Sequence, residues 1–174
     1  MARPKLKNEY ITLGTIAVVD ISTKKFPDAS MKIDLADWIN LLDQGIGRVS
    51  CNKRYAQTRL EGKLERVHKL ITPHFKLTVD HINGNPLDNR SSNLRDVTQL
   101  ENCRNKSLSK SNKSGHTGVY ERRGVKGSTW NAQIEPDGRA INLGTFKTLA
   151  KAIAARKAAE VKYGFHKNHG KEAI

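Results

Sequence analysis

The chain has 174 residues, enough for one ordinary domain or two small ones, and a formal net charge of +14. That charge predicts a nucleic-acid partner, with a merely soluble basic surface as the alternative. The sequence contains no 18-residue apolar run, no signal-peptide segment after Met1 and no basic amphipathic helix with a bulky apolar face. We therefore expect an intracellular protein without a membrane partner. Cys51 and Cys103 form no C-x-x-C pair, which argues against structural zinc.

Residues 1–66 form the first predicted region, a β-rich N-terminal segment. Residues 10–22 are rich in Ile, Val and Thr, a composition typical of one or two strands. Residues 33–42 place apolar side chains at helical spacing with polar residues on the opposite side, which predicts a helix. We assign no chemistry to this region.

The second predicted region covers residues 67–108. Residues 77–82 alternate as a strand, and Asn83-Gly84 is a strong turn signal. The segment Thr98-Gln99-Leu100-Glu101 matches a capping box, so we expect a helix that begins at Thr98. Asn102 would then lie in the first turn, facing back toward the preceding strand and loop.

Asp80 and His81 lie at the end of the predicted strand. Because neighbouring strand residues point to opposite sides, we expect divided roles rather than joint chelation of one ion. Oxygen atoms of Asp80 and Asn102 favour Mg²⁺ or Mn²⁺, and the imidazole of His81 suits a general base. The amide of Asn93 could hold the loop through hydrogen bonds to the backbone. Taken alone, each residue is more often an ordinary surface, turn or helix residue, but the ordered set predicts a phosphodiesterase site.

The same residues resemble a known family. Val79-Asp80-His81-Ile82-Asn83-Gly84-Asn85-Pro86-Leu87-Asp88-Asn89-Arg90, Ser92-Asn93-Leu94-Arg95, Val97-Thr98 and Glu101-Asn102 resemble an HNH endonuclease, and more narrowly the D-H…N…N branch of phage-encoded and intron-associated homing nucleases. The resemblance implies a ββα-metal fold, with Asp80 and Asn102 as ligands of one Mg²⁺ or Mn²⁺. It also implies His81 as the base, Asn93 as the loop clamp and, for a phage protein, the host cytoplasm as location.

Upstream, Val67-His68-Lys69-Leu70-Ile71 matches a V-H-R-L-[VI] element that often accompanies this motif, with Lys69 in place of the usual arginine. His68 has a packing and a functional interpretation of equal weight. We leave it outside the predicted catalytic set.

Residues 109–116 are the predicted linker, because the surrounding Ser, Lys and Asn run has almost nothing apolar to bury. Three short strands and an Ala-rich helix follow within residues 117–164, at Gly118–Tyr120, Thr129–Glu135, Arg139–Leu143 and Leu149–Tyr163. Pro136-Asp137-Gly138 is the expected hairpin turn, Gly164 is the expected helix stop, and residues 165–174 are a basic tail.

Strand alternation gives this sheet two different faces. Trp130, Ala132 and Ile134 share the face that we expect to pack on the helix. The other face is polar and basic, so arginines would hold phosphates while Asn131 and Gln133 could read base edges. An ordinary solvated sheet face is the alternative. The predicted DNA-binding residues are Tyr120, Arg122, Arg123, Lys126, Asn131, Gln133, Arg139 and Asn142.

This second module also resembles a known family. Gly118-Val119-Tyr120, Trp130-Asn131-Ala132-Gln133-Ile134, Leu143-Gly144-Thr145-Phe146 and the helix ending in Lys162-Tyr163-Gly164 resemble the plant ethylene-response-factor (Apetala-type) DNA-binding domain. The resemblance implies a three-stranded sheet in the major groove, backed by one helix. Arg122 matches one base-reading position. Other residues stand where that family has Arg or Trp, which implies a different or weaker sequence preference: Tyr120, Glu135, Ala140 and Asn142.

Together these features predict an α+β protein with an HNH nuclease core and a separate DNA-binding module. The predicted activity is Mg²⁺-dependent nicking or cleavage of double-stranded DNA by a monomer, leaving 5′-phosphate and 3′-hydroxyl ends. The first alternative is a non-catalytic DNA-binding regulator that retains the HNH fold. The second is an RNA-binding protein, which the scarcity of aromatic residues for base stacking disfavours.

Overall fold

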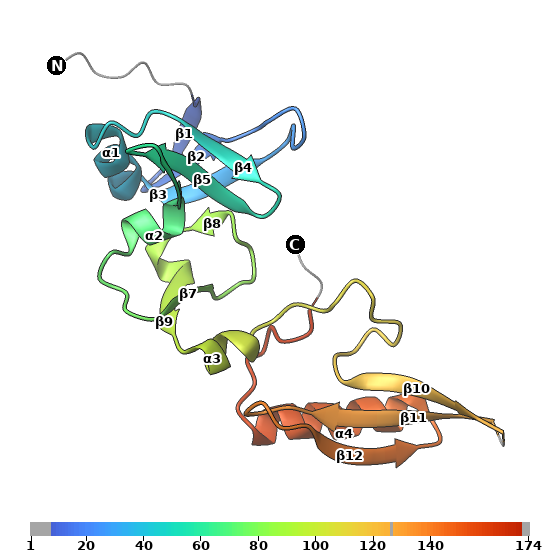
Figure 1. The fold of residues 1–174 in the computed structure, drawn as a ribbon. Coiled ribbons are helices and arrows are strands. Elements are labelled where there is room, and N and C mark those ends of the chain that lie inside the picture. Colours follow the sequence, from blue (N-terminus) through green and yellow to red (C-terminus); the bar gives the residue numbers. More distant parts are fainter. Residues whose placement is uncertain (1–7, 126, 172–174) are drawn as a thin grey trace. The chain divides into compact units, whose positions relative to one another are not determined.

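The computed structural model describes residues 8–125 and 127–171 (Figure 1). The chain divides into two compact units, an N-terminal unit (Met1–Asp96) and a C-terminal unit (Val97–Ile174). The described residues form four α-helices and several small sheets, so the protein is mixed α/β.

The N-terminal unit begins with a sheet of four strands in the order β1-β2-β3-β8. The strands are β1 (Tyr10–Leu13), β2 (Ile16–Asp20), β3 (Ser30–Asp34) and β8 (Asp88–Asn89). The predicted strand region at residues 10–22 thus holds two strands. The short β8 runs parallel to β3 and pairs Asn89 with Ile33, which brings the middle of the predicted D-H…N…N motif to the core.

Helix α1 (Leu35–Asp43) follows β3 directly. The predicted helix at residues 33–42 began too early, because Ile33 and Asp34 are the last residues of β3. Ile33 pairs with both Ala17 and Asn89, so sheet pairing outweighs its helical spacing.

A second sheet of the N-terminal unit is an antiparallel meander of β4 (Val49–Asn52), β5 (Tyr55–Leu60) and β6 (Lys63–Arg66). Its inward side chains join those of β2, β3 and α1 in one core around the fully buried Trp38. The core residues are Ala17, Val19, Ile21, Met31, Ile33, Trp38, Leu41, Ile46, Val49, Cys51, Ala56 and Val67.

Three further elements carry the motif of interest. They are the short helix α2 (Val67–Ile71) and the strands β7 (Thr78–His81) and β9 (Leu94–Val97), which pair in a two-stranded sheet. The strand and turn predicted at residues 77–84 are confirmed, since β7 ends at His81 and the Gly84 N–H donates to the His81 carbonyl at 2.8 Å. A short 3₁₀ helix, η1 (Ser91–Asn93), leads into β9.

The C-terminal unit opens with α3 (Gln99–Cys103). The Thr98 hydroxyl caps this helix and Glu101 returns the bond, so the predicted capping box is confirmed. An antiparallel sheet follows, with β10 (Val119–Gly124), β11 (Gly127–Ile134) and β12 (Ile141–Phe146), and then α4 (Leu149–Lys162). The predicted third strand is shifted, because the turn after β11 extends to Ala140.

Trp130 packs with Val119, Ala132 and Ala152, which confirms the expected helix-facing side of β11. After α4 the chain returns to the residues that follow α3. The backbone N–H groups of His166 and Gly170 donate to Arg104 and Lys106, and Leu108 donates to Lys171, at 2.8–3.2 Å. The described part of the predicted basic tail is therefore hydrogen-bonded within its unit.

Gly118 is held where only glycine fits. Its φ is +71°, and an added Cβ would meet the Gln133 carbonyl oxygen and lie 2.6 Å from Arg156 Nη1. We predict that Gly118→Ala destabilises the C-terminal unit by about 2 kcal/mol or more, because backbone strain and a steric clash combine. Hydrogen exchange of the β10–β12 amides measures this loss.

Gly138→Ala is the matched control, since Gly138 also has positive φ (+84°) but no atom within 4 Å of an added Cβ. We expect it to cost only the strain, about 1 kcal/mol. Equal effects of the two substitutions would show that the clash contributes nothing.

Candidate active site

Asp80 and His81 are both buried at the end of β7, each with 7% of its surface exposed. Asp80 Oδ2 accepts hydrogen bonds from Arg95 Nε at 2.9 Å and Nη2 at 2.7 Å. His81 Nε2 lies 3.2 Å from Asn89 Oδ1. The two side chains thus have separate partners, on β9 and on β8, as the alternation of side chains along a strand requires.

Asn89 determines which nitrogen of His81 can accept a proton. Asn89 is fully buried, and its carbonyl oxygen can only accept, so His81 Nε2 carries the hydrogen and Nδ1 holds the lone pair. Burial lowers the pKa of His81, while Asn89, Asp80 and Asp88 act in the opposite direction. The imidazole is therefore neutral at pH 7 and competent to accept a proton.

Two further rings pack around His81. The ring centroids of His68 and His81 are 5.2 Å apart, and Tyr55 lies 5.5 Å from His68 and 6.4 Å from His81. Burial, followed by the nearby His81, Arg66 and Lys69, lowers the pKa of His68 to about 3. His68, which we left outside the predicted set, is thus a neutral ring that packs against His81.

Asn93 ties the loop between β7 and β9 together. Its Nδ2 donates to the Asp88 carbonyl at 2.7 Å, and its Oδ1 accepts from the Asn83 N–H at 3.0 Å. The Asn93 carbonyl also accepts from the Ile82 N–H at 2.9 Å. One buried side chain therefore fixes both ends of the loop that follows His81.

Asp88, the first residue of β8, is a further buried carboxylate, which no sequence pattern singled out. Burial opposes its ionisation, but hydrogen bonds and charge from Arg90 and a hydrogen bond from Asn83 outweigh burial, so its pKa lies below the usual value. Arg90 donates to it at 2.7 and 2.6 Å, and Asn83 Nδ2 at 2.8 Å. The partners of Asp88 give it a structural role in the loop.

The donor set for a metal ion is small. Among the described residues no three His, Cys, Asp or Glu side chains gather closely enough to hold one. Asp80 offers carboxylate oxygen, of the type that Mg²⁺ or Mn²⁺ prefers, but Arg95 already bonds to Oδ2. Asn102, the other predicted ligand, is half-buried on α3 and belongs to the C-terminal unit. The oxygen atoms of Asp80 and Asn102 are of the type that a hard divalent ion prefers, and the N-terminal unit supplies one of these ligands, the Asp80 carboxylate.

Some of the predicted DNA-binding side chains form hydrogen bonds within the sheet, and most of them are exposed to solvent. Asn131 is buried, with Nδ2 donating to the Tyr120 hydroxyl at 2.8 Å and Oδ1 accepting from Thr145 at 3.0 Å. Asn142 Oδ1 accepts from the Gly144 N–H at 3.0 Å. Lys126 lies outside the described residues. The side chains that are exposed to solvent are Tyr120, Arg122, Arg123, Gln133, Arg139 and Asn142.

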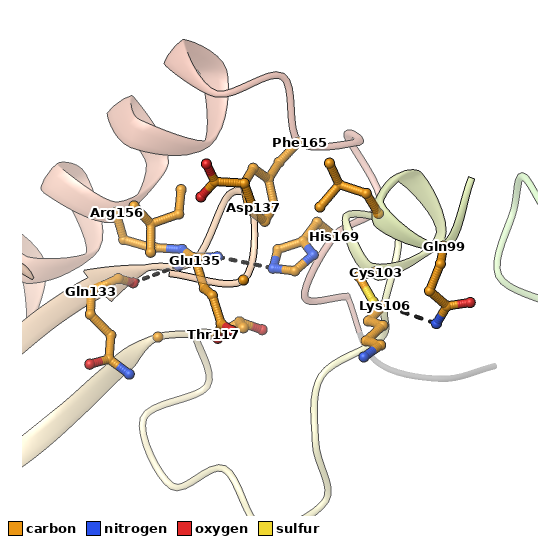
Figure 2. A pocket seen from close by; sticks show the side chains of 14 residues that line it. Gln99, Cys103, Lys106, Thr117, Gln133, Glu135, Asp137, Arg156, Phe165 and His169 are labelled. Atoms are coloured by element: carbon orange, nitrogen blue, oxygen red, sulfur yellow. Dashed lines mark hydrogen bonds between the residues drawn. The ribbon is translucent and has the colours of Figure 1, made fainter. Parts of the chain in front are cut away.

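The C-terminal unit also holds a cavity of about 550 Å³, lined by α3, the β11 end and the residues after α4 (Figure 2). The buried Arg156 at its wall donates to the Gln133 carbonyl at 2.5 Å and to Glu160 at 2.8 Å, and lies 3.0 Å from His169 Nε2. Its guanidinium is thus committed to the unit's own structure. None of the predicted catalytic or metal-binding residues lines this cavity.

A comparison with protein families matches residues 73–104 to a family described as HNH endonuclease. No curated protein and no solved structure gives a significant match. No helix in the described part of the chain is long and apolar enough to cross a membrane. The match covers β7, β9, α3 and the loop between the two strands, and it supports an HNH nuclease with DNA as the substrate.

The low pKa of His68 predicts a stability that depends on pH. The unfolded state takes up a proton on this side chain below about pH 6.5 whereas the folded state does not, so stability falls as pH decreases from 6.5 toward 3. We expect this group to cost about 2 kcal/mol of folding free energy at pH 5. Urea unfolding at pH 5 and 7.5, followed by Trp38 fluorescence in a Trp130→Phe background, measures the change.

His68→Gln should reduce this pH dependence even if it lowers stability at both pH values. Exposed His74 gives the matched control, His74→Gln, which should retain more of the wild-type slope because His74 is not buried in the unit. An unchanged slope in His68→Gln would contradict the assignment.

Proposed function

We propose that this protein is a divalent-metal-dependent endodeoxyribonuclease of the homing type that hydrolyses phosphodiester bonds in duplex DNA. The observation that carries the proposal is His81, a buried and neutral imidazole held by Asn89 within the segment similar to HNH endonucleases. That combination is what a general base at neutral pH requires.

In this proposal His81 Nδ1 accepts a proton from a water molecule, whose oxygen attacks the phosphorus. The bond from phosphorus to the 3′ oxygen of the preceding nucleotide breaks, and that oxygen gains a proton, leaving 3′-hydroxyl and 5′-phosphate ends. The hydrogen bond from Nε2 to Asn89 keeps the ring in the required tautomer and orientation. Asn93 contributes by holding the loop that follows the base.

Asp80 and Asn102 are the proposed ligands of a Mg²⁺ or Mn²⁺ ion. When bound, such an ion stabilises the negative charge that develops on the phosphate and on the departing oxygen. Metal binding would compete with Arg95 for the Asp80 carboxylate, which favours a weakly held and exchangeable ion.

The β10–β12 sheet is the proposed DNA-binding module. Exposed Arg122 and Arg139 would bind phosphates together with Lys126. The predicted contact Arg123 alternates to the Trp130 side of β10 and pairs with Glu121 at 3.3 Å, so we assign it a lesser part. Exposed Gln133 and Asn142 would then be the side chains that contact bases. The buried Asn131 is instead assigned to positioning the Tyr120 hydroxyl, since both ends of its amide are hydrogen-bonded.

The Asp80–Arg95 ion pair favours one alternative. An arginine that permanently neutralises the Asp80 carboxylate would suit a non-catalytic DNA-binding regulator that retains the HNH fold. The two proposals differ in whether a divalent ion can take Asp80 from Arg95, and a cleavage experiment separates them.

The decisive test is plasmid cleavage by purified full-length protein in Mg²⁺ or Mn²⁺. We expect nicked plasmid with the wild type, and a loss of at least about 100-fold with His81→Ala, because general-base catalysis typically contributes that much. Chelation by EDTA should abolish cleavage by the wild type.

His74→Ala removes an exposed histidine and should cleave at the wild-type rate. If the wild type cleaves none of several DNA substrates with any of several metal ions, the nuclease proposal is wrong and the non-catalytic DNA-binding regulator stands. If His81→Ala cleaves as fast as the wild type, His81 is not the general base, although the protein is still a nuclease.

A second experiment addresses the module. We predict that Arg122→Gln reduces the slope of log K against log salt concentration for duplex DNA by about 0.9, the effect of one lost phosphate contact. Lys157→Gln, which removes an exposed charge from α4 on the other side of the sheet, should leave the slope unchanged. Equal slopes for wild type and Arg122→Gln would exclude Arg122 from the interface.

A further inference from the structure

The β4–β5–β6 sheet of the N-terminal unit has a face that the nuclease site does not use. Val49, Cys51, Ala56 and Thr58 are its buried side chains, and all four point into or toward the core. Because side chains alternate along strands, the residues between them point to the opposite face. Four residues of that face are exposed to solvent: Asn52, Arg59, Leu64 and Arg66. Helix α2 contacts β5 and β6, and its His68 ring packs against Tyr55.

The strand register defines the composition of this outer face. Ser50 pairs with Gln57 and Gln57 pairs with Arg66, so these three lie side by side across the sheet. In the same way Asn52 lies beside Tyr55, and Arg59 lies beside Leu64. The outer face, which we name the meander face, consists of Ser50, Asn52, Tyr55, Gln57, Arg59, Leu64 and Arg66.

No carboxylate belongs to the meander face. Glu65 pairs with the buried Thr58 and so lies on the opposite side, while Glu61 stands in the turn before β6. The guanidinium of Arg66 lies over the Tyr55 ring at 4.4 Å, and Arg59 donates to the Gly62 carbonyl at 3.1 Å. In the part of the chain that the structure describes, neither arginine forms an ion pair.

The charge of the N-terminal unit is concentrated in this meander. Residues 48–69 hold seven Lys and Arg but only two Glu, whereas residues 1–47 and 70–96 together hold nine basic and nine acidic residues. All seven basic side chains are exposed. The net positive charge of residues 1–96 therefore comes entirely from the segment that contains the meander face.

The meander face ends at the candidate base. Tyr55 lies on this face and its ring centroid is 6.4 Å from that of His81, while Arg66 stacks on the same tyrosine. Arg59 follows Tyr55 by four residues on β5, a separation of about 14 Å along a strand. Two unpaired arginines are thus placed within the reach of a few nucleotides of His81.

We propose that the meander face, through Arg59 and Arg66, binds the phosphate backbone of the DNA strand that enters the site at His81. The inference rests on the proposed nuclease function and adds a second contact surface to it, in the unit that carries the base. Guanidinium groups suit this role because they bind phosphate oxygens in a forked geometry and lose little hydration. The uncharged side chains of Gln57 on β5 and of Ser50 and Asn52 on β4 can donate further hydrogen bonds to the backbone.

The test uses the full-length chain with Arg59→Gln and Arg66→Gln combined, and a fluorescent 30-base-pair duplex in EDTA to prevent cleavage. We expect the slope of log K against log salt concentration to fall by about 1.8, two phosphate contacts at about 0.9 each, and affinity at 0.1 M salt to fall at least about tenfold. The matched control is Lys24→Gln with Lys25→Gln, two exposed charges in the loop between β2 and β3. This control should keep the wild-type slope.

Cleavage in Mg²⁺ then separates this inference from the nuclease proposal. If both hold, the arginine double variant should show a raised KM with kcat changed less than about threefold, and Arg59→Lys with Arg66→Lys should restore most of the binding. An unchanged salt slope and KM in a protein that cleaves would overturn the inference alone. A reduced slope in a protein that never cleaves would refute the nuclease and keep the DNA contact. If Lys24→Gln with Lys25→Gln lost as much affinity as the arginine double variant, general charge attraction would explain the binding and the inference would be overturned.

Discussion

The site of this protein depends on one buried hydrogen bond, from His81 Nε2 to Asn89 Oδ1. Asn89 can hold that position because β8 pairs with β3, whose other side chains form the core of the N-terminal unit. Its Nδ2 has no hydrogen-bond partner among the described residues, which costs about 1–3 kcal/mol in a buried amide. The core therefore tolerates an unsatisfied group in order to keep an imidazole in one tautomer.

The site also buries two carboxylates, and each of them is neutralised by an arginine. Asp80 is buried beside Arg95 and Asp88 is buried beside Arg90, so each carboxylate has an arginine as its partner. At Asp88 burial alone would raise the pKa, and the hydrogen bonds and charge of Arg90 help to hold that pKa below its usual value. The two pairs differ in consequence, because Asp88 is also bound by Asn83 and stabilises the loop, whereas Asp80 is the carboxylate that a metal ion would have to share with Arg95.

Local sequence signals predicted the elements that carry the motif but not the contacts around the base. The strand before His81, the turn at Asn83-Gly84 and the Thr98 capping box each have a signal within a few residues, and all three are confirmed. Asn89 and His68 were missed as neighbours of His81. A two-residue strand has no periodicity to detect, and the contact with His68 depends on how α2 packs beside β5. Ile33 shows the same limit, since its pairing partners lie far away in sequence.

The two proposed DNA contacts would make different contributions to recognition. Arginines of the meander face would meet phosphates, which every duplex presents in the same way, so they add affinity without choosing a sequence. Choice among sequences would then rest on the few exposed amides of the β10–β12 sheet, Gln133 and Asn142. Because both contacts belong to one chain, the first to bind raises the effective concentration of the second, provided that one duplex can reach both. A weakly selective sheet would then suffice for the proposed nuclease, whose residence on DNA would be set largely by charge.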